Sequence, residues 1–325
     1  MVQRPHKQQR MPDKVEPQLA TLAAAPPSGE WLYEIKFDGY RILARIEGGQ
    51  VRLFTRNGFD WTTRMPVLAR SLAGIPAQSA WIDGEVVMQD DNGRPDFEAL
   101  QSSFSSRRTD NLVYYAFDLV YLDGEDLSDW PIEQRRGKLG QLIQIELANV
   151  RFSETFDVPP QSMLKSACEM NLEGLMGKRK GSRYRSGRTN EWVKLKCTKR
   201  QEFVIAGYTH ATGGTGMGSL ILGLPDDRSQ IHYAGRVQSG FSDKTLSKLR
   251  DVLDGLESAV SPLIDPPPSL KRDQLTWVRP VRVCEVKYAE ITSTGKVRHA
   301  SFIGLREDKN ADEVRLEKPM LLDSN

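Results

Sequence analysis

The chain has 325 residues, with 45 lysines and arginines against 43 aspartates and glutamates, 39% hydrophobic residues and 27% charged residues. This composition is typical of a globular protein, and the length exceeds what one hydrophobic core usually holds, so we expect two domains. The mean hydropathy is -0.48, no apolar run reaches 18 residues, and the N-terminal sequence lacks the apolar stretch of a secretory signal. We therefore expect a cytoplasmic protein with no membrane segment.

The cysteines and histidines argue against zinc sites. Only three cysteines occur, Cys168, Cys197 and Cys284, and none forms a C-x-x-C pair. We expect reduced thiols that pack in the interior, since a disulfide framework or a cysteine-based zinc site needs more closely spaced cysteines. The four histidines are scattered with no H-E-x-x-H pattern, so a histidine-ligated zinc site is not expected either.

Residues 1–30 are rich in proline and alanine, which predicts a tail or linker, with ordered structure beginning near Trp31. Residues 31–198 mix strand and helix patterns and predict one α+β domain, in which Gly48-Gly49 joins two strands as a hairpin. The expected strands are residues 31–37, 41–46, 51–55, 81–88 and 113–122. The expected helices are residues 61–72, 97–104, 132–147 and 162–171.

Residues 199–325 form the second expected domain. Three strand patterns are followed by a helix, a proline-rich loop and two more strand patterns. This is the element order of an OB-fold, a partly open β-barrel that often binds nucleic acid. The expected elements are strands at 202–209, 219–224 and 230–237, a helix from 243 to about 256, and strands at 281–292 and 296–303.

Positive charge is concentrated in residues 177–200, which carry ten lysines or arginines and one acid. The net charge of this segment is +9, and that of the remaining chain is -7. Within it, residues 192–196 alternate apolar and cationic side chains, which predicts a strand with Lys194 and Lys196 on one face. A cationic strand face favours a polyanionic ligand, and a solvated surface or a disordered tail is the alternative.

Lys36 begins the K-x-D-G-x-R pattern of residues 36–41, at the junction of two expected strands. A lysine that is held neutral can attack a phosphorus centre. Convergence of Lys194, Lys196 and a divalent cation near Lys36 would favour its neutral amine and would neutralise an α-phosphate. Taken alone, the pattern favours a surface turn, because Asp-Gly is common turn chemistry.

Other motifs could complete such a site. Phe117 lies on an expected strand and could present its ring to a base, and Glu85 suits a ribose hydroxyl. Glu173 precedes a short apolar stretch and suits a divalent ion, and Arg56 in a turn could hold a phosphate with two hydrogen bonds. Each motif also has an alternative without a functional role. Phe117 could simply pack in the core, and Glu85, Glu173, Arg56 and residues 306–309 could lie in solvated surface turns.

Seven motifs carry a resemblance to a known family. They are K-x-D-G-x-R at 36–41, T-R-N-G at 55–58, D-G-E at 83–85, Y-x-F-D at 115–118, E-G at 173–174, W-x-K-x-K at 192–196 and R-x-D-K at 306–309. In order and spacing they resemble the motif series of ATP-dependent DNA ligases. Residues 183–188 and 298–306 are further similar to the ligase module of bacterial ligase D, the enzyme of non-homologous end joining, and the resemblance covers about residues 18–310.

The resemblance implies a fold and a reaction. The implied fold is an α+β nucleotidyltransferase (adenylation) domain of antiparallel sheets with flanking helices over 31–198, followed by a β-barrel OB-fold domain over 199–325. In the implied reaction Lys36 attacks the α-phosphate of ATP, giving lysyl-AMP and pyrophosphate. AMP then passes to the 5′-phosphate at a nick, and the adjacent 3′-hydroxyl seals the strand and expels AMP.

The resemblance also implies roles for single residues. The nucleotide-binding residues would be Glu34, Ile35, Lys36, Arg41, Glu85, Phe117, Lys194 and Lys196. Phe117 would stack on adenine, Glu34 would read the edge of the base, and Arg41 and Glu85 would hold the ribose. The divalent metal, Mg²⁺ or Mn²⁺, would be assisted by Glu173 and Glu85.

Further implied roles concern phosphates. The catalytic residues would be Lys36, Lys194, Lys196, Arg306, Asp308 and Lys309. Lys194 and Lys196 would neutralise the α-phosphate, and Arg56 would contact the 5′-phosphate of the nick. Residues 306–309 would orient the pyrophosphate when the barrel domain closes.

The implied partners are nicked or broken double-stranded DNA, Ku, and end-joining polymerase or nuclease modules, and we expect a monomer. An RNA ligase or an mRNA-capping guanylyltransferase is the alternative enzyme, because both use a lysine nucleophile. A non-catalytic nucleic-acid-binding OB protein is the alternative of another class. Labelled ATP and GTP separate these classes, because a binding protein forms no covalent nucleotide adduct and a capping enzyme uses GTP. The sequence fits a free-standing ligase and a module of a longer chain equally.

Overall fold

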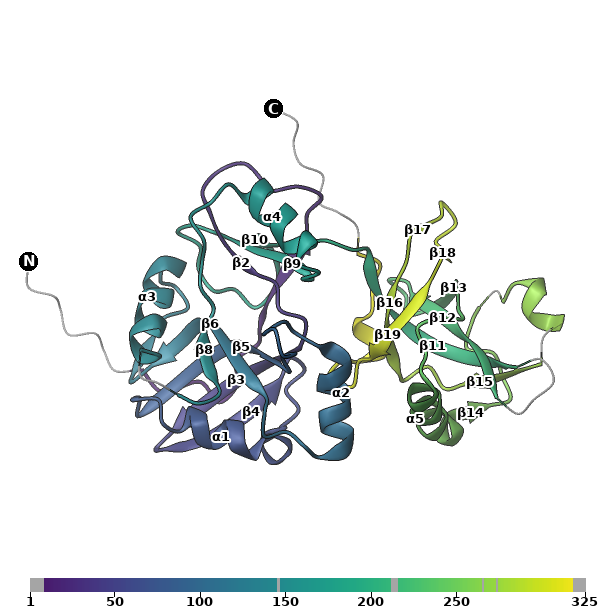
Figure 1. Ribbon diagram of the computed structural model, residues 1–325, viewed down its shortest axis with the longest axis horizontal. Coiled ribbons are helices and arrows are strands. Elements are labelled where there is room, and N and C mark those ends of the chain that lie inside the picture. Colours follow the sequence, from purple (N-terminus) through teal and green to yellow (C-terminus); the bar gives the residue numbers. More distant parts are fainter. Residues whose placement is uncertain (1–8, 145–146, 212–215, 265, 273, 318–325) are drawn as a thin grey trace, which may run out of the picture. The chain divides into compact units, whose positions relative to one another are not determined.

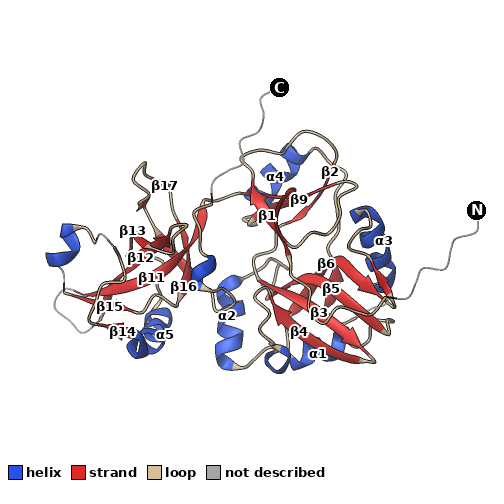
Figure 2. Ribbon diagram, turned by 180° about the vertical axis from the view of Figure 1, so that it is seen from behind, coloured by secondary structure: helices blue, strands red, loops and turns tan. Residues whose placement is uncertain are grey.

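The computed structural model describes residues 9–144, 147–211, 216–264, 266–272 and 274–317 (Figure 1). The chain forms two compact units, of which the first ends at Cys197 and the second comprises Thr198–Glu317. Among the described residues, strands contain more residues than helices in both units (Figure 2). No helix in the described part of the chain is long and apolar enough to cross a bilayer.

The larger sheet of the first unit has the strand order β4-β3-β5-β6-β7, and β8 also pairs with β6. Its strands are β3 (Tyr40–Glu47), β4 (Gln50–Thr55), β5 (Ser79–Val87), β6 (Val113–Leu122), β7 (Glu125–Asp126) and β8 (Val150–Phe152). The β3–β4 hairpin turns through Gly48 and Gly49, whose φ angles of 57° and 77° suit glycine. The predicted hairpin and the predicted strands of this sheet are thus confirmed.

The smaller sheet of the first unit has the order β1-β10-β9-β2. Its strands are β1 (Gln18–Leu22), β2 (Trp31–Ile35), β9 (Gly174–Arg179) and β10 (Gly187–Lys196). In β10, Val193 and Leu195 are buried, whereas Lys194 and Lys196 are half-buried on the other face. The alternation predicted for residues 192–196 is therefore confirmed.

Residues 9–30 are part of this fold, so the prediction of a tail over residues 1–30 is wrong for them, and order begins before Trp31. β1 pairs in parallel with β10, and Gln18 is fully buried with its side chain bonded to Thr189 Oγ1 at 2.9 Å. The Pro12 carbonyl accepts a hydrogen bond from Trp81 Nε1 at 2.9 Å. The composition of residues 1–30 did not predict this strand, because β1 is stabilised by pairing with β10, which is far away in sequence. Residues 1–8 lie outside the described residues.

Helices cover the sheets of the first unit. They are α1 (Pro66–Leu72), α2 (Phe97–Ser106), α3 (Ile132–Leu142) and α4 (Pro160–Glu169), with a 3-10 helix η1 (Thr62–Arg64) before α1. The helix predicted at 61–72 is broken at Met65, because the following Pro66 disfavours helical geometry in the residue before it. α3 ends at Leu142 rather than at 147, and residues 145–146 of that prediction lie outside the described residues.

Cys168 of α4 and Cys197, directly after β10, form a disulfide with Cα atoms 5.2 Å apart. The expectation of reduced thiols is therefore wrong for this pair, and it is confirmed for Cys284, which is free and buried. The two half-cystines are 29 residues apart in sequence. Packing of α4 against the smaller sheet brings them together, which no C-x-x-C spacing could indicate.

The sheet of the second unit has the order β13-β12-β11-β15-β14, and β16 pairs with β11 and β19. Its strands are β11 (Arg200–His210), β12 (Met217–Pro225), β13 (Ile231–Val237), β14 (Glu257–Ser258), β15 (Leu275–Val278), β16 (Val283–Lys287) and β19 (Ser301–Leu305). Among the described residues the strand pairings do not close into a complete barrel. The predicted order of three strands, a helix and further strands is confirmed, and β14 and β15 are additional.

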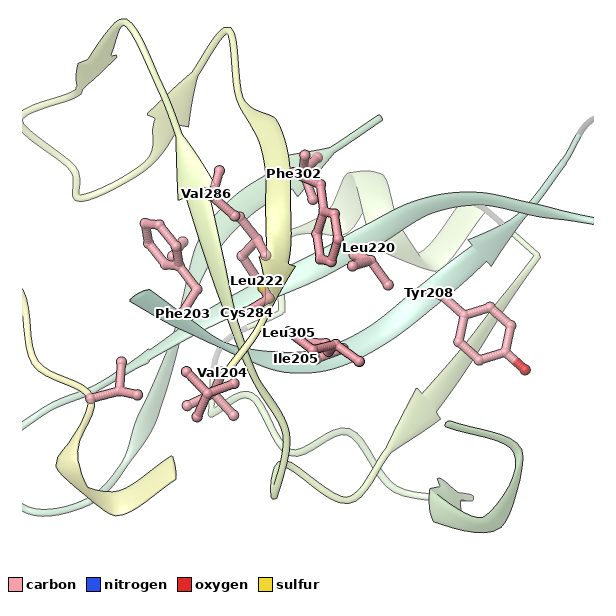
Figure 3. Packing of buried hydrophobic residues seen from close by; sticks show 14 of the residues in the cluster. Phe203, Val204, Ile205, Tyr208, Leu220, Leu222, Cys284, Val286, Phe302 and Leu305 are labelled. Carbon is pink, nitrogen blue, oxygen red and sulfur yellow. The ribbon is translucent and has the colours of Figure 1, made fainter. Parts of the chain in front are cut away.

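The remaining elements of this unit are short apart from one helix. They are α5 (Asp243–Leu253), the hairpin strands β17 (Glu290–Ile291) and β18 (Val297–Arg298), and the 3-10 helices η2 (Asp254–Leu256), η3 (Pro268–Arg272) and η4 (Ala311–Glu313). The strands predicted at 281–292 and 296–303 are each split, because β17 and β18 pair with each other around a turn that ends at Gly295. The core of this unit includes residues of β11, β12, β16 and β19, among them Phe203, Leu222, Cys284 and Phe302 (Figure 3).

Candidate active site

Three neighbouring strands bring predicted site residues onto one face of the smaller sheet. Glu34 on β2 lies opposite Met176 on β9, which lies opposite Lys194 on β10. Lys196 lies opposite Gly174. Because side chains alternate along a strand, Glu34, Lys194 and Lys196 point to the same face. That face packs toward the larger sheet, since one hydrophobic cluster contains residues of both sheets.

Lys36 follows β2 directly, and its Nζ lies 2.5 Å from Glu173 Oε2. The side chain of Lys36 is 20% exposed, and that of Glu173 is 5% exposed. The backbone is fixed as well, because Lys36 N donates to the Gly174 carbonyl at 2.9 Å. Gly174 has a φ of 146°, and a Cβ there would lie 1.9 Å from the Leu195 carbonyl oxygen. Only glycine fits this position, so the E-G motif holds β9 close to β10 beside Lys36.

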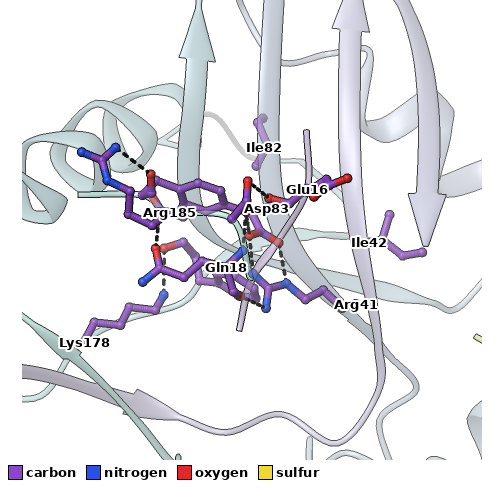
Figure 4. Close-up of polar contacts among 12 residues, drawn as sticks. Glu16, Gln18, Arg41, Ile42, Ile82, Asp83, Lys178 and Arg185 are labelled. Atoms are coloured by element: carbon purple, nitrogen blue, oxygen red, sulfur yellow. Dashed lines mark hydrogen bonds and ion pairs between the residues drawn. The ribbon is translucent and has the colours of Figure 1, made fainter. Parts of the chain in front are cut away.

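Arg41 is held in the site by a buried polar network (Figure 4). Its Nε and Nη2 donate to both oxygens of Asp83 at 2.8 and 2.5 Å, and its Nη1 donates to the Gln18 carbonyl at 2.7 Å. Asp83 is fully buried and also accepts the Tyr184 hydroxyl at 2.7 Å. Burial by itself lowers the pKa of Arg41, but the adjacent Asp83 carboxylate outweighs it and holds that pKa above its ordinary value. The guanidinium lies 5.2 Å from the centre of the Phe117 ring.

Phe117 and Glu85 lie beside this network, whereas the side chain of Ile35 lies on the opposite face of the smaller sheet from Glu34. Phe117 is 8% exposed and belongs to the hydrophobic cluster, so the plainer alternative of core packing describes part of its role. Glu85 lies opposite Arg41 in the β3–β5 register. Ile35 is half-buried and lies opposite Leu175 on β9.

Glu34 is buried, and protein donors surround its carboxylate. It accepts from Arg136 Nη1 at 2.8 Å and from Ser153 Oγ at 3.0 Å, and Lys178 Nζ lies 2.6 Å away. Burial lowers the pKa of Lys178 to about 8, although the negative charge of Glu34 acts in the opposite direction and raises this pKa. Lys178 also shows that the basic segment is not uniformly solvated, because it is only 1% exposed.

Arg56 lies in the turn that follows β4. The turn is closed by Gly58 N, which donates to the Thr55 carbonyl at 2.8 Å, and by Phe59 N, which donates to Thr55 Oγ1 at 3.1 Å. Gly58 has a φ of 81°, which explains the glycine of the T-R-N-G motif. Arg56 is half-buried on this turn.

Three residues of the 306–309 motif form an ion-pair cluster inside the second unit. Arg306 bonds both carboxylate oxygens of Asp308 at 2.9 and 2.8 Å, and its Nη1 lies 3.3 Å from Glu202 and from Glu285. Lys309 Nζ lies 2.8 Å from Glu202. Burial opposes the charge of Arg306, but Asp308 and the two glutamates keep the pKa of Arg306 above its ordinary value. The alternative of a solvated loop is wrong for these residues, since Asp308 is 1% exposed.

The residues that support Arg41 were not among the predicted site residues. Asp83 lies two positions before Glu85 in the D-G-E motif, so strand alternation could have placed both carboxylates on one face. Tyr184 lies in the stretch 183–188 that resembles ligase D, without a predicted role. Gln18 contributes through its backbone, for which the sequence carries no signal.

Comparison with known proteins agrees with this geometry. A family model described as ATP dependent DNA ligase domain matches residues 14–196, and one described as ATP dependent DNA ligase C terminal region matches residues 213–309. The chain is 50% identical over 313 residues to the multifunctional non-homologous end joining protein LigD of Pseudomonas aeruginosa, covering 95% of this chain and 37% of that protein. It is 36% identical over 309 residues to the LigD protein of Mycobacterium tuberculosis, covering 93% of this chain and 40% of that protein.

The chain thus spans less than half the length of these curated relatives. Among solved structures, a mycobacterial DNA ligase D complexed with ATP and MES is 35% identical, with a TM-score of 0.67 and coverage of 93% of this chain and 98% of that chain. The ligase domain of LigD from M. tuberculosis is 36% identical, with a TM-score of 0.51, covering 93% of this chain and 98% of that chain. The chain therefore belongs to the ATP-dependent DNA ligases, and it corresponds to the ligase domain of LigD-type proteins, with an adenylation domain followed by an OB-fold domain.

Proposed function

We propose that this ligase seals nicks and joined ends of duplex DNA through a lysyl-AMP on Lys36, as the ligase module of a non-homologous end-joining system. The observation that carries the proposal is the contact between Lys36 Nζ and Glu173 Oε2, next to the strand that bears Lys194 and Lys196. A lysine amine beside a carboxylate and two further lysines suits attack on a phosphorus centre rather than binding alone.

In the first step the Lys36 amine attacks the α-phosphate of ATP. A nitrogen–phosphorus bond forms, the bond from that phosphorus to the pyrophosphate oxygen breaks, and the proton of the amine is lost. Glu173 Oε2, 2.5 Å from Nζ, is positioned to accept that proton. Lys194 and Lys196 stabilise the charge that develops on the phosphate oxygens. AMP then passes to the 5′-phosphate of the nick, next to Arg56, and the 3′-hydroxyl displaces it.

The nucleotide is held between the two sheets of the first unit. Arg41 and Glu85, opposite each other on β3 and β5, bind the ribose, and Phe117 stacks on the adenine beside the Arg41 guanidinium. The side chain of Ile35 packs in a hydrophobic cluster on the other face of the smaller sheet, so we assign Ile35 to the framework. We assign Glu34 to the framework, because Arg136, Ser153 and Lys178 already surround its carboxylate.

The donor set suits a hard divalent cation. Glu173 and Glu85 carry carboxylates, the ligand type that Mg²⁺ and Mn²⁺ prefer together with phosphate oxygens. Glu173 would hold the ion next to Lys36, and Glu85 would approach it from β5. When bound, the ion supplies charge neutralisation at the phosphates.

Replacement of Tyr184 by phenylalanine tests the support of Arg41. The change removes the hydroxyl that donates to Asp83 and accepts from Gln18 N at 3.2 Å, so Arg41 loses part of its fixed geometry. We expect the KM for ATP in lysyl-AMP formation to rise roughly two- to tenfold, with little change at saturating ATP. Tyr121→Phe is the matched control, because its hydroxyl donates to the Gln9 carbonyl at 2.6 Å in the same cluster. Equal changes in both variants would contradict a specific support of Arg41.

The second unit offers a basic groove for the DNA backbone. It lies between β13 and the β17–β18 hairpin, and its lining combines cationic and hydroxyl side chains. These are Arg236, Lys296, Arg298, Thr292, Ser293 and Thr294. Phosphodiesters accept hydrogen bonds from these groups without sequence preference, as a nick-sealing enzyme requires.

Nick binding should depend on salt through this groove. We expect Arg236→Ala with Lys296→Ala to weaken binding to nicked duplex at every salt concentration, and to lower the log-log salt slope by about 0.9 per lost phosphate contact. Lys244→Ala removes an exposed cation of α5 outside the groove and should leave the slope unchanged. A titration of fluorescent nicked DNA over a range of salt concentrations measures both quantities. If the double variant keeps the wild-type slope, the groove does not contact DNA.

A joining assay tests the proposed function as a whole. We expect ATP-dependent sealing of a nicked DNA duplex and joining of duplex ends, stimulated by Ku and compatible with partner polymerase or nuclease modules, by a monomer in the bacterial cytosol. Sealing only of RNA would favour an RNA ligase, and labelling by GTP would favour a capping enzyme. Binding without any joining or nucleotide adduct would favour the non-catalytic alternative and overturn the proposal.

A further inference from the structure

The disulfide between Cys168 and Cys197 lies next to the candidate nucleophile. Cys168 is in the last turn of α4, and Cys197 directly follows β10, which carries Lys194 and Lys196. The loop that the bond closes, residues 168–197, contains Glu173, all of β9 and all of β10. The crosslink therefore encloses the segment that contacts Lys36.

The bond fixes the backbone at Glu173. Cys197 N donates to the Glu173 carbonyl at 3.0 Å, and Lys36 N donates to the neighbouring Gly174 carbonyl at 2.9 Å. On the other side, Leu172 N donates to the Ala167 carbonyl at 2.9 Å, one residue before Cys168. One of these hydrogen bonds involves Cys197 and another lies next to Cys168, so the disulfide connects the two points at which the backbone around Glu173 is held.

The environment of the pair suits reversible chemistry. Both cysteines are half-buried, so small reductants and oxidants reach them. Cys197 packs at the edge of a hydrophobic cluster that contains Met163 and Ala167 of α4 and Leu175 of β9. Cys284 differs, because it is fully buried in the second unit and burial raises the pKa of its thiol. Solvent-accessible thiol pairs exchange with dithiols and react with peroxide, whereas a fully buried lone thiol is inert.

We propose that Cys168 and Cys197 form a redox modification site, in which the disulfide state orders Glu173 for lysyl-AMP formation and the dithiol state loosens it. Oxidation by hydrogen peroxide forms the sulfur–sulfur bond, breaks two S–H bonds, and reduces the peroxide to two molecules of water. A dithiol reductant reverses it by giving up its two hydrogens as it becomes a disulfide. The effect on adenylation rests on the proposed function, whereas the modification itself does not.

Thiol counting and amide exchange on the full chain test the site without any activity. After peroxide, we expect one alkylatable thiol under denaturing conditions, and after reduction by dithiothreitol we expect three. Backbone amides of residues 169–174 should exchange more slowly in the oxidised chain, and its melting temperature should be higher by roughly 5 °C or more. Three alkylatable thiols after peroxide, or identical exchange in both states, would overturn the proposal.

Variants separate the effect on adenylation from general oxidation. The rate of lysyl-AMP formation should fall on the order of tenfold on reduction of the wild-type chain, because Glu173 is then less well positioned. Cys168→Ser and Cys197→Ser should each show the reduced rate under both conditions, and Cys284→Ala should respond as the wild type does. Equal rates in both states of the wild type would remove the ordering role. If neither the oxidised nor the reduced chain formed lysyl-AMP, the proposed function would be refuted. The thiol count would still show whether Cys168 and Cys197 form and break their disulfide.

Discussion

Replacing Lys36 by alanine should reduce lysyl-AMP formation to below detection, because it removes the proposed nucleophile, the amine that lies 2.5 Å from Glu173 Oε2. Sealing of an ordinary nick should disappear with it, since that reaction needs the adenylated enzyme. DNA affinity should change little, because the chain retains 44 of its 45 lysines and arginines. Labelled ATP in denaturing gels and binding to nicked duplex measure the two quantities.

The Lys36→Ala chain should still act on a nick that already carries 5′-AMP. This last step uses the DNA-adenylate directly, so it bypasses the lysine nucleophile. Lys180→Ala, which removes an exposed cation of the basic segment, serves as the control for loss of one charge. A labelled adduct on Lys36→Ala, or its appearance at another lysine, would contradict the assignment.

Replacing Arg306 and Lys309 should depress lysyl-AMP formation on the order of 100-fold, while sealing of the pre-adenylated nick falls far less. The resemblance to DNA ligases implies that both cations would stabilise the charge on departing pyrophosphate, which exists in only one of the three steps. Single-turnover assays of adenylation and of sealing, with the same enzyme and metal, measure the difference. Equal losses in the two assays would assign the cluster to the DNA steps or to stability.

Variants of Arg306 and Lys309 must be chosen with their ion pairs in mind, because loss of these pairs can destabilise the second unit and lower activity indirectly. Loss of Arg306 leaves Glu202, Glu285 and Asp308 without a shared cation, which should destabilise the second unit by roughly 3–5 kcal/mol. Lys309→Met is milder, because Arg306 still lies 3.3 Å from Glu202. Lys248→Ala is the control, since it removes a cation that pairs with Glu307 of the same turn at 3.2 Å. Thermal unfolding of each variant separates a folding defect from a catalytic one.

Short sequence patterns predicted those elements whose conformation depends mainly on neighbouring residues in the sequence. The Gly48-Gly49 turn specified the β3–β4 hairpin, and the alternation of residues 192–196 specified which face of β10 bears Lys194 and Lys196. Pro66 also carried a local signal, which the prediction of a single helix at 61–72 overlooked. The order and spacing of the seven motifs indicated the DNA ligase family, which composition alone could not indicate.

Features that depend on distant partners could not be predicted. β1 pairs with β10, a strand far away in sequence, and the proline-rich and alanine-rich residues around β1 resemble a linker. The Cys168–Cys197 bond depends on how α4 packs, and the support of Arg41 depends on Gln18, Asp83 and Tyr184 from three separate segments. The burial of residues 306–309 follows from Glu202 and Glu285 on β11 and β16, whereas the charged motif alone resembled a surface loop.

The proposed function depends on covalent transfer of AMP from ATP to Lys36. Peptide mass spectrometry of the chain after incubation with ATP and Mg²⁺, followed by a chase with nicked DNA, tests this transfer. We expect one AMP on the peptide that contains Lys36, no adduct with GTP, and loss of that AMP as sealed DNA appears. An unmodified Lys36 peptide in a chain that still seals nicks, or an adduct that DNA never discharges, would contradict the assignment of Lys36 as the nucleophile.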